Sequence, residues 1–255
     1  NSDLGWLRMQ LGDNDKAVHL RESSDEMAVI GMWGPNALGV MEPVSDDDVS
    51  PEAFPYGAAR EIRIGAATLL AQRVSYVGEP GWELYLDPAW AVQVWDRLIE
   101  AGQESGITPA GYRVLDSLRM EKGYRYYGTD MGLLDNPLEA GLGHALDLDK
   151  PSFNGRDALV AVKQAGIARR LRTLAVGDAE YLPVYGGEAV HDGGLVVGRL
   201  RSCAYGFTVR MNLAYAYLPI SYAPGAQVTV EVFGQMVPAT VMKDRVLSAS
   251  GQLAR

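Results

Sequence analysis

The C-terminal third of the sequence restricts the fold most, because strand-like runs and turns follow one another there without a helical pattern. The runs lie at residues 171–176, 195–200, 213–218, 227–233 and 236–241. The turn residues between them are Gly186-Gly187, Asp192-Gly193-Gly194 and Pro224-Gly225. Residues 171–255 therefore predict a small antiparallel barrel or sandwich.

The preceding residues mix both kinds of element. Apolar runs predict strands at residues 18–20, 27–33, 59–64 and 67–74. Spacing and capping residues predict helices over residues 3–11, 36–41 and 154–164, and two more that follow Asp87-Pro88 and Thr108-Pro109. Strands and helices in this order predict an α+β layer in which helices cover one face of a sheet.

The two middle helices carry start and stop signals. Asp87 is placed to cap the first, and Gly102 ends it. Its expected apolar stripe is Ala91, Val94, Trp95, Leu98 and Ile99. Thr108 is the expected cap of the second helix, and Gly123 its stop.

Residues 75–86, SYVGEPGWELYL, place two strand-forming runs on either side of a GEPG turn and predict a β-hairpin. A two-residue turn sets Tyr76 opposite Tyr85, and a four-residue loop sets Tyr76 opposite Glu83. In either register Tyr76 and Glu83 share a face, because side chains alternate along a strand. A three-residue loop with a bulge separates them. The alternative interpretation is an exposed strand with Glu83 in water and Tyr76 half-packed.

Composition argues against several classes of function. A net charge of −9 and an isoelectric point near 4.9 give no electrostatic basis for binding nucleic acid or an anionic membrane. His19, His144 and His191 lie far apart and Cys203 is the single cysteine, so we expect neither a metal site nor a disulfide framework. Cys203 is interpreted as a small packing residue, and the acidic run at residues 46–48 as a solvated loop. No apolar run approaches the roughly 18 residues of a membrane-spanning helix.

Common nucleotide and nucleophile motifs are missing from the sequence. It contains no G-x-G-x-x-G after a strand, no P-loop and no G-x-S-x-G. The sequence starts at Asn1 without an initiator methionine or a signal peptide. We therefore expect an N-terminally truncated fragment of a longer chain, located in the cytoplasm, or in the mitochondrial matrix if the source is eukaryotic.

Several segments resemble the aminomethyltransferase (glycine-cleavage T-protein) superfamily, in collinear order. YVGEPGWELY at residues 76–85 resembles its Y-x-G-E-x-G-x-E segment. GYRVLDSLRMEKGYR at residues 111–125, followed by GTD, is closer to one branch, the C-terminal folate domain of dimethylglycine oxidases and dehydrogenases and of sarcosine dehydrogenases. The match continues at PLEAGLG (137–143), FNGRDAL (153–159) and SCAYGFT (202–208).

The resemblance implies a T-protein-like folate-binding region over residues 1–168 and a small antiparallel β-barrel domain over residues 169–255. It implies that tetrahydrofolate accepts a one-carbon unit and becomes 5,10-methylenetetrahydrofolate. Glu83 is implied to bind the pterin and Tyr76 to line the same pocket, and Tyr85 and Tyr205 complete the expected folate-binding residues. A carboxylate accepts the adjacent N–H groups of a pterin as a bidentate pair, and a phenol ring stacks on its flat bicycle.

Two departures from the family pattern affect the expected activity. Leu115 stands where the T-protein carries an arginine just before Asp-Ser-Leu-Arg, as in the oxidase branch. The family's catalytic aspartate belongs to a glycine-rich segment upstream of the sequence given. We therefore assign no catalytic residue and expect the chain to be inactive alone, with FAD on a linked domain or subunit.

Three functions follow from the resemblance. The preferred one is the folate domain of a sarcosine or dimethylglycine oxidoreductase, which receives an iminium derived from an N-methyl amine and formed by an FAD-containing partner domain. The second is a free-standing aminomethyltransferase that works with a lipoyl carrier protein, against which Leu115 argues. The third is a non-catalytic folate-binding or scaffold protein, including relatives that support iron–sulfur enzymes. Those relatives carry Lys-Gly-Cys-Tyr, whereas this sequence reads Lys122-Gly123-Tyr124 without the cysteine.

Overall fold

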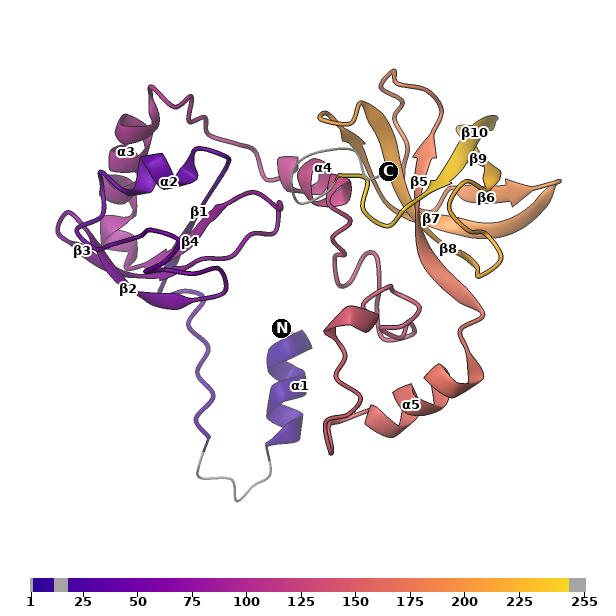
Figure 1. Ribbon diagram of the computed structural model, residues 1–255, viewed down its shortest axis with the longest axis horizontal. Coiled ribbons are helices and arrows are strands. Elements are labelled where there is room, and N and C mark those ends of the chain that lie inside the picture. The colour runs from indigo at the N-terminus through magenta and orange to yellow at the C-terminus, as the bar shows by residue number, and fades with distance from the viewer. Residues whose placement is uncertain (1, 12–17, 248–255) are drawn as a thin grey trace. The chain divides into compact units, whose positions relative to one another are not determined.

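The computed structural model describes residues 2–11 and 18–247, and the chain divides into two compact units (Figure 1). The first unit comprises Asn1–Ser75 and Glu79–Pro109, and the second comprises Tyr76–Gly78 and Ala110–Arg255. Residues 76–78 thus group with the second unit, although the sequence on both sides of them belongs to the first. Each unit has its own hydrophobic core.

The first unit contains a four-stranded antiparallel sheet with strand order β1-β4-β3-β2 (Figure 1). Its elements are α1 (Ser2–Gln10), β1 (Ala28–Trp33), α2 (Ala37–Met41), β2 (Ala59–Ile64), β3 (Ala67–Gln72), β4 (Gly81–Leu86), the 3₁₀ turn η1 (Pro88–Trp90) and α3 (Ala91–Gly102). The helices and strands predicted before residue 75 are confirmed, except that residues 18–20 form no strand.

Alternation along β4 separates a core face of the sheet from an open face. Trp82, Leu84 and Leu86 are buried in the same core as Val94 and Leu98 of α3. Since side chains alternate, Glu83 and Tyr85 lie on the opposite face, away from α2 and α3. The packing of α3 differs from prediction at Trp95, which is 41% exposed.

The hairpin predicted over residues 75–86 is wrong. Residues 75–80 form a loop, and the strand begins only at Gly81. β4 pairs instead with β1 and β3, which place Gly31 and Gln72 opposite Glu83. Tyr76 is therefore not a cross-strand neighbour of Glu83.

Long-range hydrogen bonds explain why the loop leaves the sheet. The Trp33 indole N–H donates to the Val74 carbonyl at 2.8 Å, and the Gly34 N–H donates to the Pro80 carbonyl at 2.9 Å. Gly78, between these two anchors, has φ +72°, a conformation that favours glycine and does not suit a strand. These contacts cannot be read from a short sequence pattern.

The second unit contains a closed antiparallel barrel with strand order β10-β5-β8-β7-β6-β9 (Figure 1). Its elements are α4 (Val114–Glu121), the 3₁₀ turn η2 (Gly143–Ala145), α5 (Arg156–Ala165), β5 (Arg169–Val176), β6 (Ala189–Asp192), β7 (Leu195–Gly206), β8 (Met211–Pro219), β9 (Gln227–Val232) and β10 (Gln235–Met242). The predicted C-terminal β-barrel is confirmed. The sequence did not reveal β6, because a run of four residues is too short to show alternation.

The helices of this unit follow the prediction in part. α5 matches the expected helix, and the Gly166 N–H closes it by donating to the Val162 carbonyl at 2.9 Å. α4, in contrast, begins only at Val114, and the Thr108 hydroxyl donates to the Gly106 carbonyl, so its expected capping role is wrong. The expected stop at Gly123 is confirmed by its φ of +76° directly after the helix.

The domain division at residues 168 and 169 stays a prediction. β5 does begin at Arg169, but residues 110–168 belong to the same compact unit as the barrel. Among residues 2–11 and 18–247, no helix has the length and apolar character of a membrane span. Over the same ranges, no three His, Cys, Asp or Glu side chains are arranged to hold a metal ion.

Candidate functional site

Glu83 lies on the open face of the first unit's sheet, where its first partner comes from its own strand. The Tyr85 hydroxyl donates to Glu83 Oε2 at 2.5 Å. Residues i and i+2 of a strand point to one face, so β4 alone sets up this contact. The hydrogen bond to the carboxylate, followed by burial, raises the pKa of Tyr85 to about 12, and the hydroxyl stays a donor at neutral pH.

Neighbouring strands shape the space around the Glu83 carboxylate. A Cβ atom on Gly31, opposite Glu83 on β1, would lie 2.3 Å from the Trp33 ring, so the indole lies across Gly31. Gln72, opposite Glu83 on β3, brings an amide to the same face. Glu83 is thus flanked by an indole, a phenol and an amide. The sequence analysis missed Trp33 and Gln72, because only the strand register identifies them.

Tyr76 lies in a different environment, within the second unit. Its hydroxyl donates to the Arg125 carbonyl at 2.8 Å. Its ring stacks on Tyr124 with centroids 6.1 Å apart, and the Tyr126 ring lies 6.3 Å away. Burial raises the pKa of Tyr76 to about 12. Tyr76 therefore belongs to a tyrosine cluster, and the expectation that it shares a hairpin face with Glu83 is wrong.

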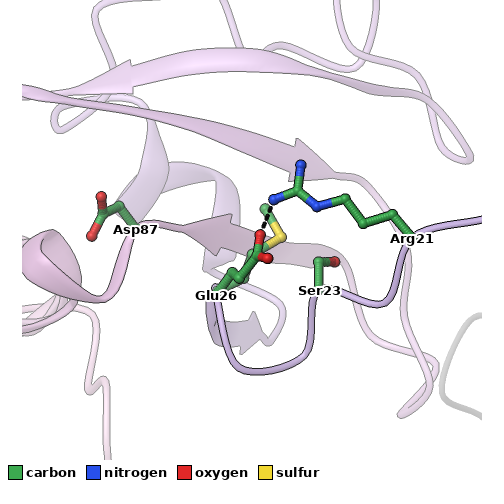
Figure 2. Close-up of a pocket in the computed structure, with 5 residues that line it drawn as sticks. Arg21, Ser23, Glu26 and Asp87 are labelled. Atoms are coloured by element: carbon green, nitrogen blue, oxygen red, sulfur yellow. Dashed lines mark hydrogen bonds and ion pairs between the residues drawn. The ribbon is translucent and has the colours of Figure 1, made fainter.

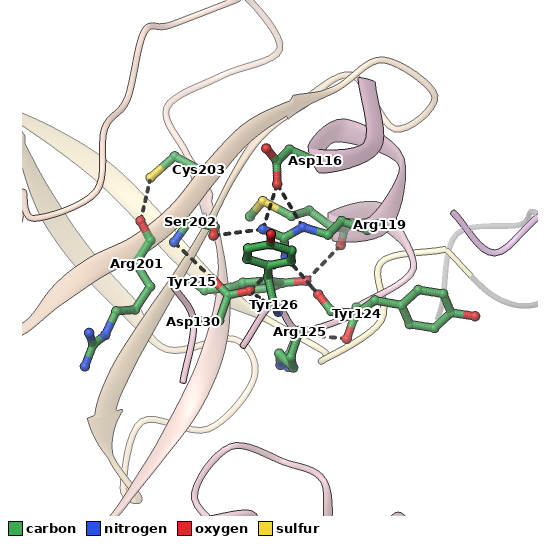
Figure 3. Close-up of polar contacts among 12 residues, drawn as sticks. Asp116, Arg119, Tyr124, Arg125, Tyr126, Asp130, Arg201, Ser202, Cys203 and Tyr215 are labelled. Carbon is green, nitrogen blue, oxygen red and sulfur yellow. Dashed lines mark hydrogen bonds and ion pairs between the residues drawn. The ribbon is translucent and has the colours of Figure 1, made fainter. Parts of the chain in front are cut away.

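A buried ion-pair network lies next to this cluster (Figure 3). The Arg119 side chain of α4 is 1% exposed and donates to the Asp130 carboxylate at 2.8 Å, to the Ser202 hydroxyl at 2.8 Å and to the Tyr124 carbonyl at 3.0 Å. It also pairs with Asp116, one turn back, at 2.8 Å. One guanidinium thereby joins α4, the loop that follows it and β7 of the barrel.

Other residues of the Asp-Ser-Leu-Arg-Met-Glu segment also bind the barrel. The Ser117 hydroxyl donates to the Tyr205 carbonyl at 2.6 Å. Glu121 is 1% exposed and its Oε1 accepts the backbone N–H groups of Thr208 at 2.7 Å and of Val209 at 3.3 Å. The segment that carries much of the family resemblance therefore positions α4 on the barrel.

Tyr205 lies on β7, with its own set of neighbours. Its hydroxyl donates to the Ala179 carbonyl at 2.7 Å, and its ring packs edge-to-face on Tyr181 and Phe207 at 5.8 and 5.1 Å. Of the expected folate-binding residues, the structure brings Glu83 and Tyr85 into contact. Tyr76 and Tyr205 have separate ring neighbours within the second unit.

A hollow of about 380 Å³ on the first unit is lined by Arg21, Ser23, Glu26, Met27 and Asp87 (Figure 2). Arg21 and Glu26 form an ion pair across it. Asp87 accepts the Ala89 N–H at 2.8 Å, which confirms its expected capping role. None of the expected site residues lines this hollow, so it is not the candidate folate site.

Comparison with known protein families identifies the family of this chain. A sequence model described as the GCVT N-terminal domain matches residues 1–150, and one described as the glycine cleavage T-protein C-terminal barrel domain matches residues 169–246. The chain belongs to the glycine cleavage T-protein family. This confirms the expected family and fold class, and it assigns the β5–β10 barrel to the T-protein barrel domain.

Relatives of this T-protein family chain include oxidoreductases and aminomethyltransferases. It is 36% identical to dimethylglycine dehydrogenase from Rattus norvegicus over 95% of this chain, and 38% identical to sarcosine dehydrogenase from Homo sapiens over 82%. It spans 28% and 22% of the lengths of those two proteins. It is 34% identical to the aminomethyltransferase of Halothermothrix orenii, and the match covers 94% of this chain and 66% of that protein.

A solved structure supports the fold of the T-protein family chain. The glycine cleavage system aminomethyltransferase T from Bartonella henselae matches with a TM-score of 0.74. The match covers 85% of this chain and 58% of that one, at 23% sequence identity. The chain is thus an aminomethyltransferase-type domain related to dimethylglycine and sarcosine dehydrogenases.

Proposed function

We propose that this chain is the tetrahydrofolate-binding, one-carbon-accepting domain of an oxidoreductase that acts on N-methyl amines such as sarcosine or dimethylglycine. The observation that carries the proposal is the Glu83 carboxylate on the open sheet face, bonded to Tyr85 and flanked by Trp33. The similarity to dimethylglycine and sarcosine dehydrogenases supports the choice of oxidoreductase.

The side chains around Glu83 fit one edge of a pterin. Glu83 accepts one hydrogen bond from Tyr85, and a carboxylate has about four acceptor positions, so it retains capacity for a ring N–H and an exocyclic amine. The Trp33 indole supplies a flat apolar surface on which an aromatic bicycle stacks. The Tyr85 hydroxyl holds the carboxylate in place by donating to Oε2.

In this proposal the chain contributes binding and orientation. Tetrahydrofolate supplies the amine nitrogens that accept the carbon and yields 5,10-methylenetetrahydrofolate. Glu83 fixes the pterin edge, which converts a bimolecular encounter with an iminium into a reaction between held partners. FAD and the amine substrate belong to a linked domain or subunit, and the assembly works in the cytoplasm or, in a eukaryote, in the mitochondrial matrix.

Replacement of Glu83 tests the pterin assignment. We expect 5-formyltetrahydrofolate to bind a version of this domain that includes its upstream segment, and Glu83→Ala to weaken that binding by more than about tenfold, because a charged hydrogen-bond acceptor is lost. Isothermal titration calorimetry measures the affinity. The matched control is Glu61→Ala on β2, an exposed carboxylate of the same sheet, which should bind like the parent chain. Equal affinity in Glu83→Ala and Glu61→Ala would reject the assignment.

A free-standing aminomethyltransferase is the second candidate, favoured by the 66% coverage of the Halothermothrix orenii protein. It shares the predicted folate contacts but works with a lipoyl carrier protein, and Leu115 argues against it. The coding sequence upstream of Asn1 separates the two. A strand–turn–helix with G-x-G-x-x-G supports the oxidoreductase, whereas a start codon within one further domain length supports the aminomethyltransferase. Folate binding without one-carbon transfer by the whole protein would support a non-catalytic scaffold instead.

A further inference from the structure

A groove of about 840 Å³ lies in the second unit, on the barrel surface along the first part of β7 and the last part of β8. The two strands pair from Leu200 and Ala216 to Gly206 and Met211. The first part of β7, residues 195–199, pairs with β6 alone among the described strands. The groove is lined by both strands and by three arginines, Arg169, Arg199 and Arg201.

Tyr217 lines the groove with a hydroxyl that has no hydrogen-bond partner among the described residues. Alternation along β8 puts Ala214, Ala216 and Leu218 inside the barrel and Tyr217 on its outer side. The residue is 7% exposed. A buried hydroxyl without a partner costs free energy, so such a group calls for an explanation.

The contrast with Tyr215 makes the Tyr217 hydroxyl unusual. Tyr215 lies two residues earlier on the same outer face, and its hydroxyl donates to the Tyr124 carbonyl at 3.1 Å. Arg169 and Arg201 instead lie over the Tyr217 ring, with their guanidinium carbons 4.7 and 5.5 Å from the ring centroid. The Tyr217 ring thus packs against two guanidinium groups, while its hydroxyl has no acceptor among the described residues.

The charges around the groove are only partly balanced. Arg169 donates to Asp135 at 2.9 Å and to Glu139 at 3.2 Å, and Arg201 lies 3.9 Å from Asp135. Arg199 donates to the Gly187 carbonyl at 3.0 Å and forms no ion pair within the described part of the chain. Arg199 is therefore the arginine of the groove lining that carries no carboxylate partner among the described residues, and it supplies an unbalanced guanidinium to the groove.

We propose that this groove binds an oxyanion, the phosphate or carboxylate group of a small ligand, through Arg199, Arg201 and the Tyr217 hydroxyl. Arginine presents paired N–H groups that match both kinds of oxyanion, and a hydroxyl adds a charge-assisted hydrogen bond. Such a ligand supplies the acceptor that the Tyr217 hydroxyl lacks. The site lies on the barrel unit and uses none of the residues assigned to the pterin, so it stands independently of the proposed function.

Titration of the full chain with inorganic phosphate and, separately, with acetate tests the site at constant ionic strength. The readout is the backbone amide NMR shift of Gly187 and Gly198, which line the groove. We expect saturable shifts with at least one anion, and Tyr217→Phe and Arg199→Gln should each weaken that binding by about tenfold, as expected for loss of a charged hydrogen bond. Arg97→Gln removes an exposed arginine of α3 in the other unit and should leave the affinity unchanged.

The two anions identify which group the groove prefers. Saturation by phosphate alone indicates a phosphorylated ligand, saturation by acetate alone indicates a carboxylate ligand, and saturation by both supports an oxyanion site of either kind. Tyr217→Phe should keep or raise the melting temperature of the parent chain, because no internal partner is lost and a buried hydroxyl without an acceptor is removed. The proposal is overturned if neither anion saturates, or if Tyr217→Phe and Arg199→Gln bind as tightly as Arg97→Gln.

Discussion

At the scale of single residues, the Arg119–Asp130 pair shows how much a buried ion pair contributes to stability. Asp130 is 0% exposed and accepts, besides Arg119, the backbone N–H groups of Tyr126 at 2.8 Å and of Ser202 at 3.2 Å. We expect Arg119→Met to lower the free energy of unfolding by about 3–5 kcal/mol, because it leaves a buried carboxylate without its cation. Urea unfolding followed by circular dichroism measures the loss.

An exposed ion pair of the same chemistry provides the control. Arg63 and Asp46 lie 3.5 Å apart with side chains 63% and 52% exposed. Arg63→Met should change the free energy of unfolding by no more than about 1 kcal/mol, since water already solvates both charges. If Arg119→Met and Arg63→Met lower the free energy of unfolding equally, burial does not explain the contribution of the Arg119 ion pair.

At the scale of elements, the cap at the start of η1 and α3 is the clearest link between a sequence signal and a structure. Asp87 Oδ1 accepts the Ala89 N–H at 2.8 Å. Asp87→Ala should destabilise the first unit by about 1 kcal/mol, because an N–H at the helix start loses its acceptor. Asp87→Asn keeps an acceptor oxygen and should recover most of the loss in thermal unfolding. Equal destabilisation by both variants would argue against capping.

The same elements show which parts of the fold and site a sequence reveals. Asp87, Gly102 and Gly123 were predicted correctly, because caps and stops depend on residues a few positions apart. The 75–86 hairpin was wrong, because the Trp33 indole holds the loop from 41 positions away. The Glu83–Tyr85 contact lies within one strand, but its indole and amide neighbours depend on the pairing of β4 with β1 and β3.

At the scale of the whole molecule, buried tyrosines predict how stability depends on alkaline pH. Burial raises the pKa of Tyr215 and of Tyr217 to about 12, and these residues are 0% and 7% exposed. An unfolded tyrosine loses its proton near pH 10, so the stabilisation is complete below about pH 10 and is lost as pH rises toward about 12. Each tyrosine should lower the free energy of unfolding by about 1.4 kcal/mol per pH unit across this window.

Urea unfolding at a series of pH values, followed by tyrosinate absorbance, measures this slope in the barrel unit. Tyr215→Phe provides the internal control, because phenylalanine cannot ionise and the variant therefore loses one tyrosine's share of the slope.

Tyr215→Phe should also lower the free energy of unfolding at neutral pH by about 1 kcal/mol, since the hydrogen bond from the Tyr215 hydroxyl to the Tyr124 carbonyl is lost. Tyr217→Phe should reduce the slope in the same way without that neutral-pH loss, because its hydroxyl has no partner among the described residues. A slope that both variants leave unchanged would assign alkaline unfolding to other groups. The combined pattern separates what a buried phenol contributes by staying protonated from what it contributes by donating a hydrogen bond.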